Sequence, residues 1–178
     1  VQVGAAQVAF PAAATASTQE EHTPGEVVRL RMHTANLGGA EFASLELPLP
    51  AAITEAQHDM MLNAQMQGVR TTLQEGGATD IVEQRVTQDG RPGFELRGVI
   101  RSLGGQAYVR YLIDGGTMVG IMVWPKEKVD ADTAAARQKL VDAFAKSFVF
   151  GAAPLAATPV AIDWEGMCHE AHGRPLVV

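Results

Sequence analysis

Candidate metal ligands gather near the C-terminal end of the chain. Cys168, His169 and His172 stand close to Glu165 in the segment WEGMCHEAHG. Thiolate, imidazole and carboxylate groups are the ligands that zinc prefers in proteins. His169 and His172 are three residues apart, however, one short of the spacing that aligns the two histidines of the zinc-protease motif HExxH. We treat Cys168, His169 and His172 as candidate zinc ligands; the alternative is an incidental, solvated cluster in a segment rich in proline and glycine.

A second candidate site consists of cationic and aromatic side chains on one face of a predicted sheet: Arg97, Arg101, Tyr108 and Arg110. Three guanidinium groups on one face could hold a carboxylate or a phosphate through paired hydrogen bonds, and would then form a binding site. The alternative is a cross-strand network that Glu95 closes, with Glu83 as a further carboxylate, partly covered by a helix.

Residue patterns of the common catalytic sites are missing from the chain. Cys168 has only its direct neighbour His169 as a base, which is a poor geometry for activating a nucleophile. There is no GxSxG motif, and the glycine pairs at 76–77, 104–105 and 115–116 form neither a GxGxxG motif nor a P-loop. We therefore expect no catalytic residues and no cofactor. A small metal-dependent enzyme that uses the Cys/His cluster is kept as an alternative.

Hydrophobic periodicity predicts the elements that would position these side chains. Alternation of apolar and polar residues predicts about six strands, over 27–34, 40–47, 81–86, 94–101, 107–113 and 118–124. Apolar residues at helical spacing predict one helix from Thr54 to Gly76 and another over 130–148. Thr54 and Gln57 occupy the two positions of a capping box, which supports a helix start at this point.

The segment Asp114-Gly-Gly-Thr117 predicts a tight hairpin, because both central residues of a type I′ turn need a positive φ. This turn sets the register of the two flanking strands, in which three pairs face each other: Ile113 with Met118, Tyr111 with Gly120 and Val109 with Met122. The ring of Tyr111 would then cover the bare backbone of Gly120.

The last predicted strand, 118–124, is apolar on both faces, with Val119, Ile121 and Val123 on one of them. A strand of this kind needs cover on both sides of the sheet. The fold class predicted is therefore α+β: an α/β/α sandwich with a mainly antiparallel sheet of about six strands and two main helices. The predicted organisation is an extended lead-in over 1–17, an α+β domain over 18–150, and a Pro/Gly-containing tail over 151–178.

Composition excludes several classes of partner and site. The 178 residues carry a formal net charge of −6, which argues against binding to nucleic acid. One cysteine permits no intramolecular disulfide and no four-cysteine zinc site. Apolar runs all fall short of the ~20 residues that a transmembrane helix needs. A lone cysteine is compatible with the cytosol and with a bacterial envelope.

Three local motifs occur in a distinctive order along 8–150: Val8-Ala-Phe-Pro11, Gly90-Arg-Pro-Gly-Phe-Glu95, and Ala143-Phe-Ala-Lys-Ser-Phe148. With the predicted order of hairpin, helix, strands and helix, they resemble the PsbP-like fold. That group includes the DcrB-type bacterial envelope lipoproteins, the photosystem protein PsbP and a nuclear import factor that binds the GTPase Ran. The resemblance implies an α/β/α sandwich and no shared catalytic residues, and the matching positions are structural.

The resemblance leads us to expect a non-catalytic domain of a bacterial cell-envelope protein, located in the periplasm or envelope, that binds another protein or assists an assembly. The alternative from a different class is a type VI secretion effector chaperone or adaptor, which would be cytoplasmic and would bind an apolar segment in a methionine-lined groove. Five methionines fall in two predicted elements that could line such a groove: Met60, Met61, Met66, Met118 and Met122. The alternative is that these methionines fill the core of the domain.

Overall fold

The computed structural model describes residues 1–23, 26–49 and 54–151. The elements in these residues, in chain order, are β1 (Gln2–Val3), β2 (Ala6–Gln7), β3 (Thr15–Thr23), β4 (Glu26–Leu37), β5 (Ala40–Pro48), α1 (Glu55–Glu75), β6 (Thr79–Gln88), β7 (Arg91–Ile100), the 3₁₀ turn η1 (Arg101–Leu103), β8 (Gly105–Asp114), β9 (Thr117–Pro125), α2 (Ala131–Ser147) and β10 (Val149–Phe150). The tail predicted over 151–178 lies outside the described residues except for Gly151.

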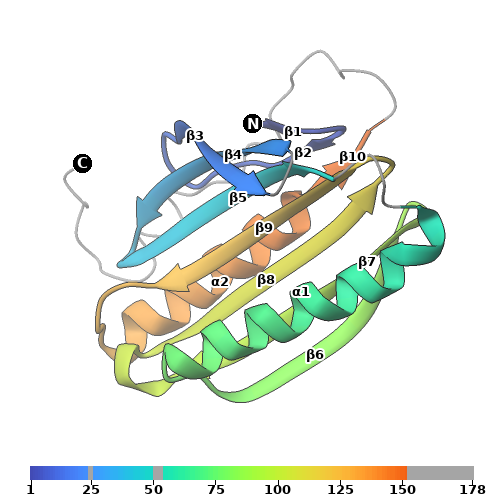
Figure 1. Ribbon diagram of the computed structural model, residues 1–178. Helices are drawn as coiled ribbons and strands as arrows, with labels where there is room; N and C mark the ends of the chain where they lie inside the picture. The colour runs from blue at the N-terminus through green and yellow to red at the C-terminus, as the bar shows by residue number, and fades with distance from the viewer. Residues whose placement is uncertain (24–25, 50–53, 152–178) are drawn as a thin grey trace.

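The main sheet has seven antiparallel strands in the order β3-β4-β5-β9-β8-β7-β6. A second, small sheet has the order β1-β2-β10. Helix α1 packs on one face of the main sheet, and α2 lies on the other (Figure 1). The α+β class and its two main helices are thus confirmed, whereas the predicted number of about six strands was too low.

The strand missing from the prediction is β3, at the edge of the main sheet. It pairs with β4 along its whole length, from Thr15 opposite Thr34 to Thr23 opposite Glu26. Its residues from Thr15 to Glu20 are exposed, and their sequence, TASTQE, has no apolar alternation. Because an edge strand with two solvated faces needs no apolar side, hydrophobic periodicity does not reveal it.

The predicted hairpin register is confirmed. In the β8–β9 pair, Ile113 faces Met118, Tyr111 faces Gly120 and Val109 faces Met122. The ring of Tyr111 lies so close to Gly120 that any side chain at this position would collide with it. The turn at Gly115 therefore sets the pairing of two central strands. Gly115 has a φ of +58°, but Gly116 has no positive φ, so the prediction of a type I′ turn with a positive φ at both glycines was wrong.

Strand β9 is fully covered on its α2 side, as predicted, but only partly on the other side, where Met122 and Trp124 keep exposed surface. Val119, Ile121 and Val123 are fully buried in a core cluster with Leu140 and Phe144 of α2. On the other face, Met118 belongs to a second cluster, together with Leu62 and Leu73 of α1. The sheet therefore separates two apolar cores.

Helix α1 begins after the predicted N-cap residue, and α2 begins after the first of the two residues, Asp130 and Asp132, that could cap it. The backbone N–H of Thr54 and its hydroxyl both donate to Oε1 of Gln57, at 2.9 and 3.0 Å. Asp130 precedes α2, and its Oδ1 accepts from the backbone N–H of Thr133 at 2.8 Å. Helix α1 ends at Glu75, and Gly76 is its C-cap residue.

Helix α2 also carries a buried cation, Arg137, which is 1% exposed. Its guanidinium donates to the backbone carbonyls of Gly38 at 2.9 Å, Leu103 at 3.4 Å and Glu127 at 3.2 Å. Burial lowers the pKa of Arg137, and nearby Glu127 opposes this effect. The side chain thus joins the β4–β5 turn, η1 and the segment after β9 to one point of α2.

The N-terminal residues, predicted as an extended lead-in, are extended and form part of the core. Val3, Ala6 and Val8 are buried against β9 and α2 in the first cluster. Strand β2 pairs with β10, placing Ala6 opposite Phe150. The backbone N–H of Ala9 donates to the Ser147 hydroxyl at 3.0 Å. The beginning and the end of the described chain therefore close the same side of the sheet.

Candidate functional site

A cleft of about 410 Å³ lies between α2 and the strands β6, β7 and β8; we call it the α2 cleft. Its polar lining consists of Gln88, Arg97 and Arg110 from the sheet, with Asp142 and Lys146 from α2. Ala145 of α2 and Val149, which follows α2, add an apolar wall. A cavity of this size is within the range of small-molecule sites.

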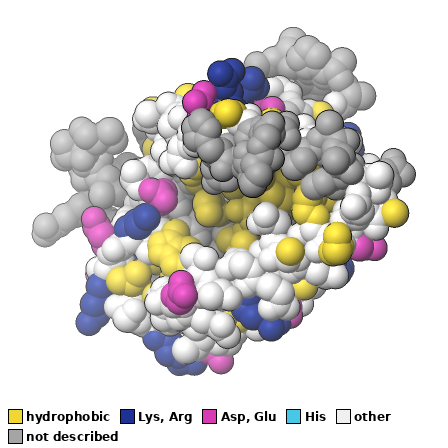
Figure 2. Space-filling model, in the orientation of Figure 1, with side chains coloured by type: hydrophobic (Ala, Val, Ile, Leu, Met, Phe, Trp, Pro, Cys, Tyr) yellow, Lys and Arg dark blue, Asp and Glu magenta, His cyan; other side chains and the backbone are white. Residues whose placement is uncertain are grey.

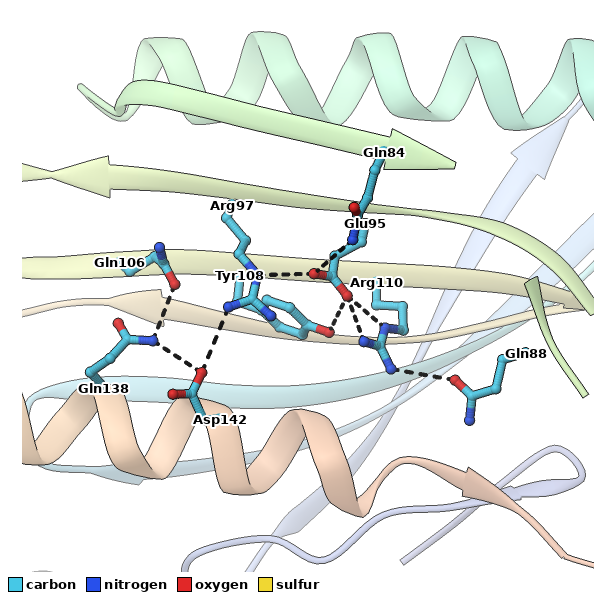
Figure 3. Close-up of polar contacts among 9 residues, drawn as sticks. All are labelled: Gln84, Gln88, Glu95, Arg97, Gln106, Tyr108, Arg110, Gln138 and Asp142. Carbon is cyan, nitrogen blue, oxygen red and sulfur yellow. Dashed lines mark hydrogen bonds and ion pairs between the residues drawn. The ribbon is translucent and has the colours of Figure 1, made fainter. Parts of the chain in front are cut away.

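Glu95 is the centre of the polar network beneath the cleft (Figure 3). It is 4% exposed, and its carboxylate accepts from Nε of Arg97 at 2.9 Å, from the Tyr108 hydroxyl at 2.9 Å, and from Nε and Nη2 of Arg110 at 2.9 and 2.5 Å. Gln84 adds a longer contact at 3.5 Å. The predicted cross-strand network closed by Glu95 is therefore present.

The ionisation of this network follows from its geometry. Burial acts to raise the pKa of Glu95, but the hydrogen bonds from Arg110, Arg97 and Tyr108 outweigh it and hold the pKa below its usual value. Burial raises the pKa of the Tyr108 hydroxyl well above its usual range, and the charge of Glu95 adds to this effect. Near neutral pH the network thus contains a carboxylate, a neutral phenol and two guanidinium ions.

Contacts to Glu95 hold Arg97 through Nε and Arg110 through Nε and Nη2, and Nη1 of each arginine contacts a residue that lines the α2 cleft. Nη1 of Arg97 lies 3.7 Å from Oδ1 of Asp142, beyond hydrogen-bond distance. Nη1 of Arg110 donates to Gln88 at 3.3 Å. Both guanidinium groups also lie over the ring of Tyr108, at 4.9 and 5.8 Å from its centre. The arrangement positions two cations rigidly at the floor of an open cleft.

The structure brings together three of the four residues predicted for this site: Arg97, Tyr108 and Arg110. Arg101 is elsewhere, because β7 ends at Ile100 and the chain turns into η1. Its Nη2 contacts Asp80 at 2.7 Å, and its side chain is 74% exposed. Glu83, the second predicted carboxylate, pairs instead with Arg70 of α1.

Sequence reasoning missed the contribution of α2 to this site. Asp142 lies four residues after Gln138, so that both side chains share a helix face, and Gln138 donates to Asp142 and to Gln106 of β8, at 3.2 Å each (Figure 3). The i, i+4 spacing was the available signal. It does not reveal which strands that face meets.

On the opposite side of the sheet, part of the apolar face lies beside α1 rather than beneath it. Figure 2 shows hydrophobic side chains gathered in a hollow of this face, next to α1. We call the side chains of β4, β5 and β9 that are only partly buried here the open strip: Leu30, Met32, Leu47, Met122 and Trp124. Buried Leu45, opposite Met32 in the ladder, forms its floor.

The predicted zinc ligands Cys168, His169 and His172 lie outside the described residues. Within the part of the chain that the structure describes, no three His, Cys, Asp or Glu side chains are close enough to hold a metal ion. Neither of the helices described there is long and apolar enough to cross a membrane.

Comparison with known proteins identifies no relative whose site could be compared with this one. No family model, curated protein or solved structure matches this chain.

Proposed function

We propose that the protein is a non-catalytic protein-binding domain of a bacterial cell-envelope protein. In this proposal the open strip binds an apolar helix of a partner protein. The observation that carries this proposal is that the described residues cover the two faces of the sheet unequally. Helix α2 and the small sheet lie over one face, whereas α1 packs on β6, β7 and β8 of the other face and lies beside the open strip. The envelope location rests on the resemblance to DcrB-type lipoproteins.

The size of the open strip suits one helix. The strands β9, β5 and β4 are neighbours, so they cover about 10 Å across the sheet at ~4.8 Å per strand pair. An α-helix with its side chains is about 10–12 Å wide. A partner helix lying next to α1 would complete the helical layer on this face, as two-layer packing requires.

The lining of the open strip favours an apolar partner. Opposite residues in an antiparallel ladder share a face, which places Met32 and Leu45, Leu47 and Met118, and Ala43 and Met122 on this side. Among the described side chains on this face of β4, β5 and β9, Glu41 alone is charged, and it pairs with Lys126 at 3.3 Å. Flexible methionines can adapt to different apolar surfaces.

A labelled synthetic peptide tests the proposal. We expect an alanine/leucine helix of about 18 residues, about 27 Å long, with flanking lysines for solubility, to bind the full chain in fluorescence anisotropy. A peptide with serine and glutamine in place of leucine should not bind. Met32→Glu should weaken binding at least tenfold, because it puts a charge on the open strip.

The matched control is Met60→Glu, since Met60 is 66% exposed on α1 and lies outside the open strip. It should bind the peptide like the unmodified protein. Equal affinities of the Met32→Glu and Met60→Glu proteins, both with unchanged melting temperatures, would contradict the proposal.

The methionines of the open strip also favour a second candidate, the secretion chaperone or adaptor, because it too would bind an apolar segment. The two candidates differ in location. A signal peptide or lipidation motif encoded before Val1 in the gene would support the envelope protein, and a coding sequence without one would support the cytoplasmic chaperone.

A further inference from the structure

We infer that the α2 cleft is a second binding site, which binds the carboxylate of a ligand with a small apolar group. This site lies on the face of the sheet opposite the open strip and does not depend on the proposed function. The inference rests on three features of the described residues: the charge balance of the cleft, the unused hydrogen-bond donors of Arg97, and the apolar wall beside them.

The charge balance favours a ligand with a single negative charge. Arg97, Arg110 and Lys146 carry three positive charges, whereas Glu95 and Asp142 carry two negative charges. One positive charge is therefore left over, although the whole chain has a net charge of −6. A carboxylate would neutralise this excess, whereas a phosphate dianion would leave the cleft negative beside Asp142.

The donors favour a planar, two-oxygen group. Glu95 accepts from Nε of Arg97, and the remaining contact of this guanidinium is the 3.7 Å approach of Nη1 to Asp142. Both terminal nitrogens of Arg97 thus have no hydrogen-bond partner among the described residues. These two nitrogens form the edge of the guanidinium that binds a carboxylate through two parallel hydrogen bonds. The contact to Glu95 fixes the orientation of this edge in advance.

The apolar wall of the α2 cleft favours a ligand with an apolar body. Ala145 and Val149 line the cleft beside Lys146, and Val149 is 47% exposed. A ligand whose carboxylate contacts Arg97 would place its remaining atoms against these side chains. The volume of about 410 Å³ accommodates a group the size of one amino-acid side chain with its backbone.

N-Acetyl-phenylalanine is a probe with these properties, and its amide is the uncharged control. We expect the acid to bind in isothermal titration calorimetry and to shift the ¹⁵N–¹H signals of the arginine Nε groups, with the amide at least tenfold weaker. An acetylated tripeptide with a free C-terminal phenylalanine is the second arm. If it binds more tightly than the single residue, the carboxylate belongs to the end of a peptide; otherwise it belongs to a small acid.

Arg97→Gln should reduce the affinity for the acid at least tenfold. Arg101→Gln is the matched control, because Arg101 is an exposed arginine paired with Asp80, away from the cleft. Since Arg97 also contacts buried Glu95, two substitutions on α2 provide a test that leaves this network intact. Lys146→Gln should weaken binding, and Asp142→Asn should tighten it severalfold by removing the carboxylate that competes for Arg97.

Two results would overturn the inference. One is equal binding of the acid and its amide. The other is tighter binding of inorganic phosphate than of the acid to the unmodified protein, which would contradict the charge balance. Weaker binding of the acid to the Asp142→Asn protein would contradict the role of Asp142 as a competitor for Arg97.

Discussion

Glu95 shows how a buried charge is accommodated in this protein. An isolated carboxylate at 4% exposure would be strongly destabilising, because it has lost its hydration. Here two guanidinium groups and a phenol donate to it, and both arginines keep part of their surface in the α2 cleft. The carboxylate therefore positions Arg97 and Arg110 for a ligand while its own charge is compensated.

The lowered pKa of Glu95 makes stability depend on acid pH. The unfolded chain binds a proton at about pH 4.3, above the pKa in the folded state, so folding stability rises with pH in this range and is lost as the pH falls through the folded value. Glu95→Gln should lower the free energy of unfolding by about 2–4 kcal/mol at pH 7. The difference from the unmodified protein should shrink below about pH 4.

Urea unfolding from pH 7 to pH 3 measures both effects. Glu20→Gln is the matched control, because Glu20 pairs with Arg29 at the surface, with its side chain 49% exposed. This substitution should change stability by less than about 1 kcal/mol at any pH. A constant difference between the Glu95→Gln and unmodified proteins across the whole range would show that the ionisation of Glu95 does not contribute.

At the scale of elements, the β8–β9 hairpin connects the two halves of the sheet. Its turn and its register follow from a few adjacent residues, and its close packing depends on Gly120. A Cβ at this position would collide with the Tyr111 ring and come within 2.7 Å of the Arg110 carbonyl oxygen. Because Tyr111 is itself buried among α1-side residues, the ring has little freedom to move away.

Gly120→Ala should therefore destabilise the protein by about 1–3 kcal/mol, the usual range for overpacking a core. Thermal unfolding followed by circular dichroism measures the change. Gly116→Ala, in the turn of the same hairpin, is the control, since nothing lies within 4 Å of a Cβ there. Equal melting temperatures for the two variants would mean that the Tyr111 contact does not constrain the hairpin.

At the scale of the whole molecule, the two faces of the sheet are covered in different ways. One face is closed by α2 together with strands from both ends of the described chain, β1, β2 and β10. The other carries α1 and the open strip. The closed face holds the α2 cleft and the partly covered face offers the apolar surface, so two kinds of ligand could bind without competing.

Because the N-terminal residues pack on the α2-side core, substitutions in them should change the stability of the whole domain. Val8→Ala should lower the free energy of unfolding by about 1–3 kcal/mol, because Val8 is 2% exposed and its loss leaves a cavity against the α2-side core. Val1→Ala, at a position that is 44% exposed, should have almost no effect. Chemical denaturation of both variants measures this, and an equally small effect at both positions would show that the N-terminal residues do not stabilise the domain.

Several features of the fold could be predicted from the sequence because their causes are local. Alternation showed which side chains share a strand face, Thr54 and Gln57 marked the start of α1, and the two glycines after Asp114 set the β8–β9 register. The apolar character of β9 on both faces predicted cover on both sides of the sheet, because apolar side chains favour burial, and the structure completes that cover only on the α2 side.

Only the tertiary structure decided the features that depend on contacts between distant segments. Arg101 lies away from the predicted site because β7 ends one residue before it. Asp142 and Lys146 of α2 line the site, which the sequence did not predict. Arg137 is buried although it is charged, because three backbone carbonyls from other segments accept hydrogen bonds from its guanidinium. A polar edge strand and two-residue strands have no periodicity to detect. Local patterns show which residues lie on the same face of an element, but the sum of many weak long-range contacts decides what packs against that face.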